Sequence, residues 1–207
     1  MPFDETQIKL SILILSIPSR FEALIALFKK IESQIKIPGS VEILCLVDNK
    51  SKHIADKRND LLVSAQGKFL CYLDDDDDIS DDYIDSLISA IDSNPNVDIV
   101  TFNQKCTING EDMKVYFGMG HPTQELYRNP DRTLGDILRP PFHMCVWKSD
   151  IAKSEKFKRI YSFDGQSCED YDWTSRLYPK IKTELKIDKV LHHYIYNSKT
   201  TESIVRQ

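Results

Sequence analysis

Five consecutive aspartates, residues 74–78, follow directly after the apolar segment 69–73. Carboxylates this close together repel one another strongly unless a cation neutralises them. Clusters of carboxylate oxygens suit hard divalent cations such as Mg²⁺ and Mn²⁺. The alternative is a solvated acidic loop that caps a helix beginning near Ser80, because acidic residues stabilise helix N-termini. We favour a metal site, because the run lies at the end of a predicted strand.

Glu169 and Asp170 form a second acidic group, at the start of a predicted helix over residues 169–178. A carboxylate can accept the proton of an attacking hydroxyl, but acidic residues also cap helices. The residues alone favour the capping interpretation. Arg176 lies seven residues after Glu169 and four after Asp172, so on a helix it can pair with either. A phosphate is the other partner open to it.

Predicted strands and helices alternate over the first half of the chain. The aspartate run follows the third of these strands. Apolar strands separated by amphipathic helices predict an α/β protein with a mostly parallel, doubly wound sheet. Ligands of such sheets bind beyond the carboxyl ends of the strands. The polar segments 16–20, 48–50 and 74–78 would share that edge. The predicted strands are 9–17, 41–47, 69–73 and 97–102, and the predicted helices are 21–35, 54–66 and 83–91.

The second half, from about Cys106, is less regular. Residues 118–141 are rich in Gly, Pro and polar side chains and predict a long loop, a feature often tied to function. Residues 142–147 and 189–196 are predicted strands. No internal repeat and no linker indicates a second folding unit, so we expect a single domain over residues 1–207.

Composition excludes several classes of protein. With 207 residues, 41% hydrophobic and 29% charged, the chain can bury an ordinary core. The net charge of −5 comes from one acidic stretch, so nucleic acid is not an expected partner. The longest apolar run, residues 10–17, is far shorter than the roughly 20 residues of a membrane span. The sequence contains no GxGxxG and no GxxxxGK[ST] motif, which argues against a dinucleotide fold and a P-loop.

The five cysteines are widely spaced and form no CxxC pair, so we expect free thiols in a reducing compartment. The first residues show no basic stretch before an apolar one, and a signal peptide is not expected. Both observations predict a cytoplasmic protein.

Five ordered segments resemble the motifs of GT-A-fold glycosyltransferases of the large inverting family 2. Residues 9–20 resemble the opening strand and first nucleotide loop of that family, and residues 47–51 its "VDDGS" segment. Residues 57–69 resemble the "ARN…A.G.Y" stretch, and residues 73–83 the "LDADD…Y" metal motif. Residues 168–173 resemble its "ED" helix start. The resemblance covers roughly residues 8–200 and implies a GT-A-type nucleotide-diphospho-sugar transferase fold.

The resemblance assigns a nucleotide-binding half to residues 1–105 and an acceptor-binding half to residues 106–207. It implies that Asp76 binds Mn²⁺ or Mg²⁺, with the register within the five aspartates open by one or two positions. It further implies that Asp170 is the catalytic base. The residues that it places near the nucleotide are Pro18, Arg20, Asp48, Lys57, Arg58, Asp74 and Asp75.

Four more residues have both a functional and a structural interpretation. Glu169, Arg176 and Trp173 are candidates for contact with the acceptor or for support of the site, and core packing is the simpler use of Trp173. A late histidine ligates the metal in some such enzymes. His193 is the weak candidate here, and an ordinary strand histidine is the default.

The expected function is therefore a metal-dependent, inverting transfer from a nucleotide-diphosphate sugar, expected to be a UDP-sugar, to an acceptor hydroxyl. The acceptor would be a glycan, a lipid-linked molecule or a protein. Asn49 and Lys50 depart from the family pattern at the base-binding segment, and no QxxRW motif occurs. The alternatives are a nucleotidyltransferase-like enzyme and a non-catalytic relative that binds a metal or a sugar nucleotide.

Overall fold

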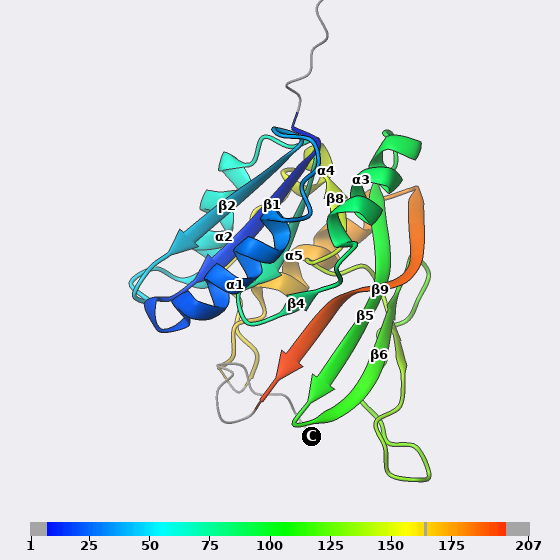
Figure 1. The fold of residues 1–207 in the computed structure, drawn as a ribbon. Helices are drawn as coiled ribbons and strands as arrows, with labels where there is room; N and C mark the ends of the chain where they lie inside the picture. Colours follow the sequence, from blue (N-terminus) through cyan, green and yellow to red (C-terminus); the bar gives the residue numbers. More distant parts are fainter. Residues whose placement is uncertain (1–7, 164, 198–207) are drawn as a thin grey trace, which may run out of the picture.

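The structure is a computed structural model that describes residues 8–163 and 165–197 (Figure 1). The strands in this part of the chain belong to one sheet, in the order β2-β1-β3-β8-β5-β6-β7. Strand β9 joins it beside β5 and also pairs with the short β4. Helices flank the sheet, and most of its paired residues lie in parallel pairs. The predicted mostly parallel α/β architecture is confirmed. The expected domain 1–207 extends at both ends beyond the described residues.

Strand β1 (Leu10–Ser16) lies at the centre of the first half. It pairs in parallel with β2 (Val41–Val47) and with β3 (Phe69–Asp74). Every residue of β1 is buried, as expected of a strand covered on both faces. The crossovers are α1 (Phe21–Glu32), which ends three residues before the predicted boundary, and α2 (Ile54–Ser64).

The strand order departs from the simplest parallel arrangement after β3. Helix α3 (Tyr83–Ser93) leads to β5 (Ile99–Ile108), which runs six residues past the predicted end. Strand β8 (Val146–Lys148) separates β5 from β3 and is antiparallel to both. Residues 142–145, also expected to be extended, precede β8 without joining the sheet.

The second half adds a hairpin and a long return strand. Strand β6 (Glu111–Phe117) pairs with β5 across Asn109-Gly110, whose φ values of 50° and 89° fit a two-residue hairpin turn. Strand β7 (Ile137–Arg139) lies within the predicted loop and pairs with β6. Strand β9 (Glu184–Tyr196) runs parallel to β5 (Figure 1).

Besides the 3₁₀ turns η1 (Pro18–Arg20) and η2 (Tyr178–Lys180), three further elements complete this part of the chain. They are α4 (Ser149–Ala152), α5 (Glu169–Leu177) and the short strand β4 (Asp78–Ile79). Within residues 8–163 and 165–197, no helix has both the length and the apolar character needed to cross a membrane.

Trp173 fixes α5 to the sheet. Its side chain is fully buried, and its ring stacks on Phe157 with centroids 4.5 Å apart. Tyr72 of β3 and Trp147 of β8 meet the same indole edge-on. The indole Nε1 donates a hydrogen bond to the Glu155 carbonyl at 3.0 Å. Trp173 therefore packs in the core and supports the first turn of α5 from behind.

We expect Trp173→Ala to lower the free energy of unfolding by about 3–5 kcal/mol, because it deletes a large buried aromatic side chain. Urea denaturation followed by circular dichroism measures the change. Val63→Ala, at a side chain that is 75% exposed, should stay within about 0.5 kcal/mol of the wild type. An equally stable Trp173→Ala variant would show that the indole does not support the core.

Candidate functional site

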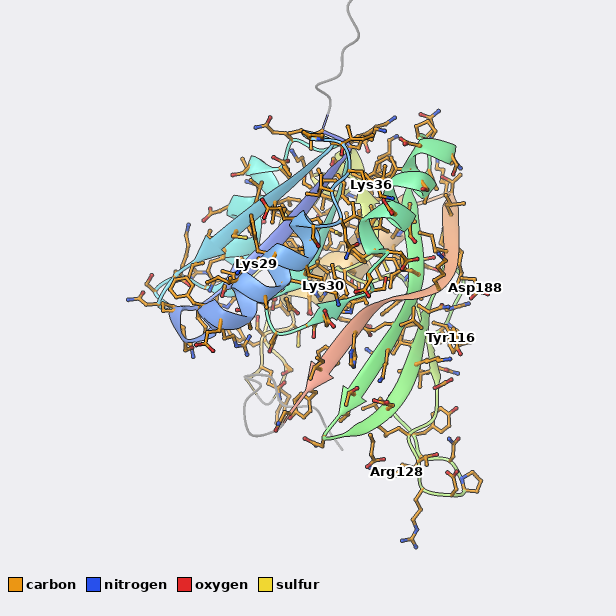
Figure 2. All side chains as sticks on the ribbon, in the orientation of Figure 1. Lys29, Lys30, Lys36, Tyr116, Arg128 and Asp188 are labelled. Carbon is orange, nitrogen blue, oxygen red and sulfur yellow. The ribbon has the colours of Figure 1, made fainter. Side chains whose placement is uncertain are left out.

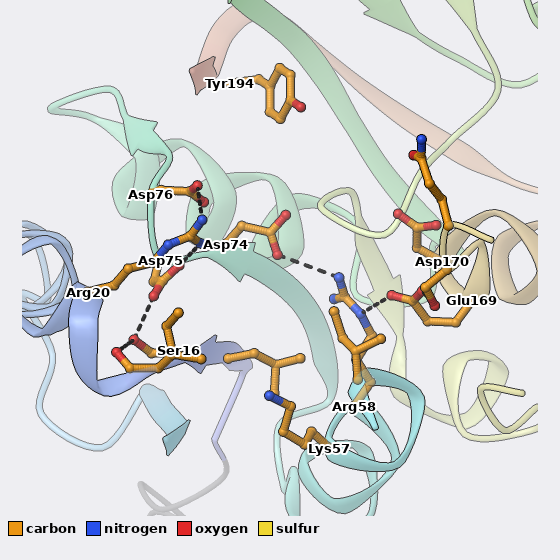
Figure 3. A pocket seen from close by; sticks show the side chains of 15 residues that line it. Ser16, Arg20, Lys57, Arg58, Asp74, Asp75, Asp76, Glu169, Asp170 and Tyr194 are labelled. Atoms are coloured by element: carbon orange, nitrogen blue, oxygen red, sulfur yellow. Dashed lines mark hydrogen bonds and ion pairs between the residues drawn. The ribbon is translucent and has the colours of Figure 1, made fainter. Parts of the chain in front are cut away.

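A cavity of about 320 Å³ opens at the carboxyl ends of β1 and β3 (Figure 3), the edge expected for an α/β sheet. Its walls come from the end of β1, the first turns of α2 and α5, the aspartate run and strand β9. The lining residues are Leu15, Ser16, Ile17, Arg20, Ile54, Lys57, Arg58, Asp74, Asp75, Asp76, Gln166, Ser167, Glu169, Asp170 and Tyr194.

Arg58 of α2 lies at the centre of the charged groups (Figure 3). Its side chain is 3% exposed, and its Nε donates to Glu169 Oε1 at 3.1 Å. A second guanidinium nitrogen lies 3.5 Å from Asp74 Oδ1. Burial opposes the charge on Arg58, but Asp74, Glu169 and Asp170 outweigh it and raise the pKa of the guanidinium. Arg58 therefore stays charged and links the aspartate run to α5.

Asp74 and Asp75 are both held by partners from other elements. Burial alone would raise the pKa of Asp74, but the nearby His143 and Arg58 bring it below its usual range. Asp75 is buried and accepts hydrogen bonds from Ser16 Oγ at 2.6 Å and from Arg20 at 2.9 Å. Asp75 thus connects the aspartate run to the end of β1.

Asp76 is the third aspartate of the run that lines the cavity, and its side chain is more exposed than that of Asp75 but less exposed than that of Asp74. Its side chain is 29% exposed, and Arg20 lies 3.0 Å from its Oδ2. Burial, together with the charges of Asp77, Asp74 and Asp75, raises the pKa of Asp76 to about 6, although Arg20 opposes the shift. A free carboxylate here is electrostatically costly.

The remaining two aspartates of the run do not line the cavity. Asp77 is buried beneath β9, where it accepts a hydrogen bond from the Ile195 amide at 3.1 Å and lies 3.3 Å from His192 Nε2. Asp78 pairs at 2.8 Å with Lys30, which lies on α1 (Figure 2). The first three aspartates of the run therefore line the cavity, and the last two pair with residues outside it.

Asp170 faces the cavity from the first turn of α5, beside Glu169 (Figure 3). Burial and the neighbouring charge of Glu169 raise the pKa of Asp170, although His143 and Arg58 oppose the shift. His143 Nδ1 lies 3.7 Å from Asp170 Oδ2, and His143 Nε2 lies 3.7 Å from Asp74 Oδ2. Glu169 differs from Asp170 because Arg58 and the Ser167 hydroxyl occupy its two oxygens.

Several predicted site residues lie outside the cavity. Pro18 begins the 3₁₀ turn η1 (Pro18–Arg20), and only Arg20 of that turn reaches the lining. Asp48 lies behind Lys57, whose Nζ is 2.7 Å from Asp48 Oδ1. That hydrogen bond from Lys57 lowers the pKa of Asp48 to about 2.

Two more candidates are engaged elsewhere. Arg176 pairs with Asp172 at 2.7 Å and with Glu155, and it does not reach the cavity. His193 Nε2 lies 2.7 Å from the Thr107 hydroxyl on β5, away from the lining of the cavity. Among the residues that the structure describes, no three His, Cys, Asp or Glu side chains are arranged to hold a metal ion by themselves.

Sequence reasoning assigned no role at this site to Ser16, and it missed Tyr194 and Ser167. Ser16 is the last residue of β1, so its position at the strand end was a usable signal. Tyr194 reaches the cavity from β9, a strand whose pairing partner nothing in the sequence indicates.

Comparisons with known proteins identify the fold. No family model matches the chain, and no curated protein matches it. The structure of S. aureus TarS 1-349 in complex with UDP-GlcNAc is similar, with a TM-score of 0.65 and 16% identity over 92% of this chain and 59% of that chain. The UDP complex of the same protein gives a TM-score of 0.62 and 16% identity over 91% of this chain and 60% of that one.

A third structure, S. aureus TarS 1-349, gives a TM-score of 0.59 at 16% identity and covers 90% of this chain and 60% of that one. This chain thus spans about three fifths of the length of these structures. The likeness confirms the expected fold class, an α/β fold with a mostly parallel central sheet.

Replacing Arg58 tests the charge balance of the site. We expect Arg58→Met to lower the free energy of unfolding by about 3–5 kcal/mol, because Glu169 is then left buried without its partner. The double variant Arg58→Met/Glu169→Gln should recover most of that loss. Urea denaturation measures both.

The matched control is Arg159→Met, which breaks the exposed pair with Asp56 and should cost no more than about 1 kcal/mol. If Arg58→Met is as mild as this control, Arg58 does not hold the site together.

Proposed function

We propose that the chain transfers a sugar from a nucleotide-diphosphate sugar, most simply a UDP-sugar, to an acceptor hydroxyl with inversion at the anomeric carbon. The charge of the cavity carries this proposal. Its lining holds three basic side chains, Arg20, Lys57 and Arg58, against five acidic ones. A nucleoside diphosphate fits such a pocket only together with a divalent cation. The TarS structures that share the fold hold UDP-GlcNAc and UDP, which supports this donor class.

Mn²⁺ or Mg²⁺ is the cation that we propose, with Asp76 as its main ligand and Asp74 beside it. Such ions are often bound by one or two carboxylates together with substrate phosphates. The absence of a three-ligand cluster among the described residues fits an ion shared with the diphosphate. When bound, the ion would neutralise the charge that develops on the departing diphosphate. The pKa of Asp76 is raised despite its pairing with Arg20, which fits a carboxylate that can take up a further positive charge.

The base is Asp170 in this proposal. Glu169 is committed to Arg58 and Ser167, whereas Asp170 faces the cavity and its Oδ2 has His143 only at 3.7 Å. The raised pKa of Asp170 makes it a stronger proton acceptor than an ordinary aspartate. It would take the proton of the acceptor hydroxyl as the oxygen attacks the anomeric carbon. Attack on the face opposite the diphosphate inverts that carbon. Arg20 and Lys57 would orient the nucleotide, with Asp48 fixing Lys57 from behind.

Binding of UDP should depend on both Mn²⁺ and Asp76. We expect UDP with Mn²⁺ to raise the thermal unfolding midpoint of the wild type by mass action, and UDP alone to raise it much less. Asp76→Asn should lose the metal-dependent part of the shift. Asp78→Asn is the matched control, because Asp78 pairs with Lys30 outside the cavity. An unchanged shift in Asp76→Asn would move the metal to another residue. No shift in the wild type would overturn the proposed donor.

Asp170→Asn should keep the affinity for UDP and reduce release of UDP from UDP-sugars by at least about 100-fold, because an amide cannot accept the proton. The assay follows UDP release in water and with simple hydroxyl acceptors. Asp172→Asn, on the same helix but paired with Arg176, serves as the control. Turnover that is unaffected in Asp170→Asn would leave Asp170 as a helix cap only.

A further inference from the structure

A second cavity, of about 240 Å³, adjoins the nucleotide pocket and shares Asp74, Asp170 and Tyr194 with it. Strands β5, β6 and β7 supply half of its lining residues. Apolar side chains dominate this half of the lining, among them Val115 and Phe117 of β6. The proposed base therefore lies at the junction of two cavities of different chemical character.

Arg139, at the end of β7, is the one Lys or Arg among the described residues that line the second cavity. Its Nε is buried and has no hydrogen-bond partner. Among residues 8–163 and 165–197, no carboxylate lies within ion-pair distance of its guanidinium, although Arg20, Lys57 and Arg58 all have such partners. A partly buried guanidinium without a carboxylate partner favours binding of an anion, although three aspartates also line this cavity.

A third cavity, of about 210 Å³, lies on the other side of Arg139 and shares Arg139 and Phe142 with the second. Its walls include Tyr171, the residue after the proposed base, and Tyr178. It has no lining residue in common with the nucleotide pocket. A ligand can therefore reach Arg139 from a side that the nucleotide does not occupy.

We infer that the second and third cavities bind the acceptor, and that the acceptor carries an anionic group, a phosphate or a carboxylate, that pairs with Arg139. This inference rests on the proposed function and adds the class of acceptor to it. A guanidinium binds either anion through two parallel hydrogen bonds, which also fixes the orientation of the ligand. The apolar wall contacts the carbon skeleton, and the hydroxyl to be modified lies beside Asp170. The donor has its own anionic group, the diphosphate, in the first cavity.

The experiment compares matched hydroxyl compounds that differ in one anionic group. The probes are glucose, glucose 6-phosphate and glucuronate, together with glycerol and glycerol 3-phosphate. Their affinities are measured by ligand-observed NMR on the full chain in the presence of UDP and Mn²⁺. We expect the wild type to bind the anionic members at least about tenfold more tightly than the neutral ones, and Arg139→Gln to lose that preference. Arg139→Lys should keep part of it, because the charge remains without the planar fork.

The matched control is Arg128→Gln. Arg128 is exposed on the segment between β6 and β7 (Figure 2), pairs with Glu111, and lines none of the three cavities. This variant should keep the full preference, and UDP should bind equally to all the variants.

Three results would overturn the inference. A wild type that binds UDP but shows no preference for anionic probes overturns the acceptor class and leaves the proposed function intact. A preference that survives in Arg139→Gln removes Arg139 from the site. The same NMR measurement is made with UDP-glucose and UDP-glucuronate in place of UDP, and if Arg139→Gln weakens only the binding of UDP-glucuronate, the anion belongs to the donor sugar. A wild type that does not bind UDP overturns the proposed function itself.

Discussion

The buried guanidinium of Arg58 holds this site together. It lies within reach of two carboxylates, Asp74 at the end of β3 and Glu169 at the start of α5, which come from opposite halves of the chain. Without that charge, the acidic residues around the cavity would repel one another in surroundings that screen charge poorly. The face of Tyr72 lies 5.1 Å from the Arg58 guanidinium, so the aromatic core and the charged site meet at one residue.

Neighbouring acidic residues of this site have different roles, because their partners differ. Asp75 accepts hydrogen bonds from Ser16 and Arg20, and Asp77 lies beside His192, so both carboxylates have partners within the protein. Asp76 and Asp170 remain as carboxylates with raised pKa values. Residues of one type thus serve as anchors or as reactive groups according to the partners that surround them. The environment, rather than the residue type, decides which carboxylates are available for chemistry.

Much of the fold and part of the site could be predicted from the sequence. The apolar runs of the first half located β1, β2 and β3 within a residue or two, although only β1 and β3 are buried along almost their whole length and β2 is partly exposed. The position of Asp74 at the end of β3 followed from the same pattern. The hairpin of β5 and β6 was missed, although Asn109-Gly110 was a usable turn signal.

The pairing of strands that are distant in the sequence could not be predicted. Nothing local indicates that β8 separates β3 from β5, or that Tyr194 returns to the cavity on β9. The unpaired charge of Arg139 could not be predicted either, because being unpaired depends on every neighbour in space.

The return of β9 alongside β5 has a consequence for how the chain folds. The pairing of β5 with β9 joins residues that are distant in the sequence, such as Ile99 and Glu184. Arg58 and Glu169, which form an ion pair, are 111 positions apart. Contacts of such separation form slowly, because a long loop must close before they contribute any stability. Strands β1 to β3 can associate early through nearer contacts. The pocket is then completed last, when most of the chain has left the ribosome. Until then Arg58 lacks Glu169, the carboxylate from the second half of the chain that pairs with it.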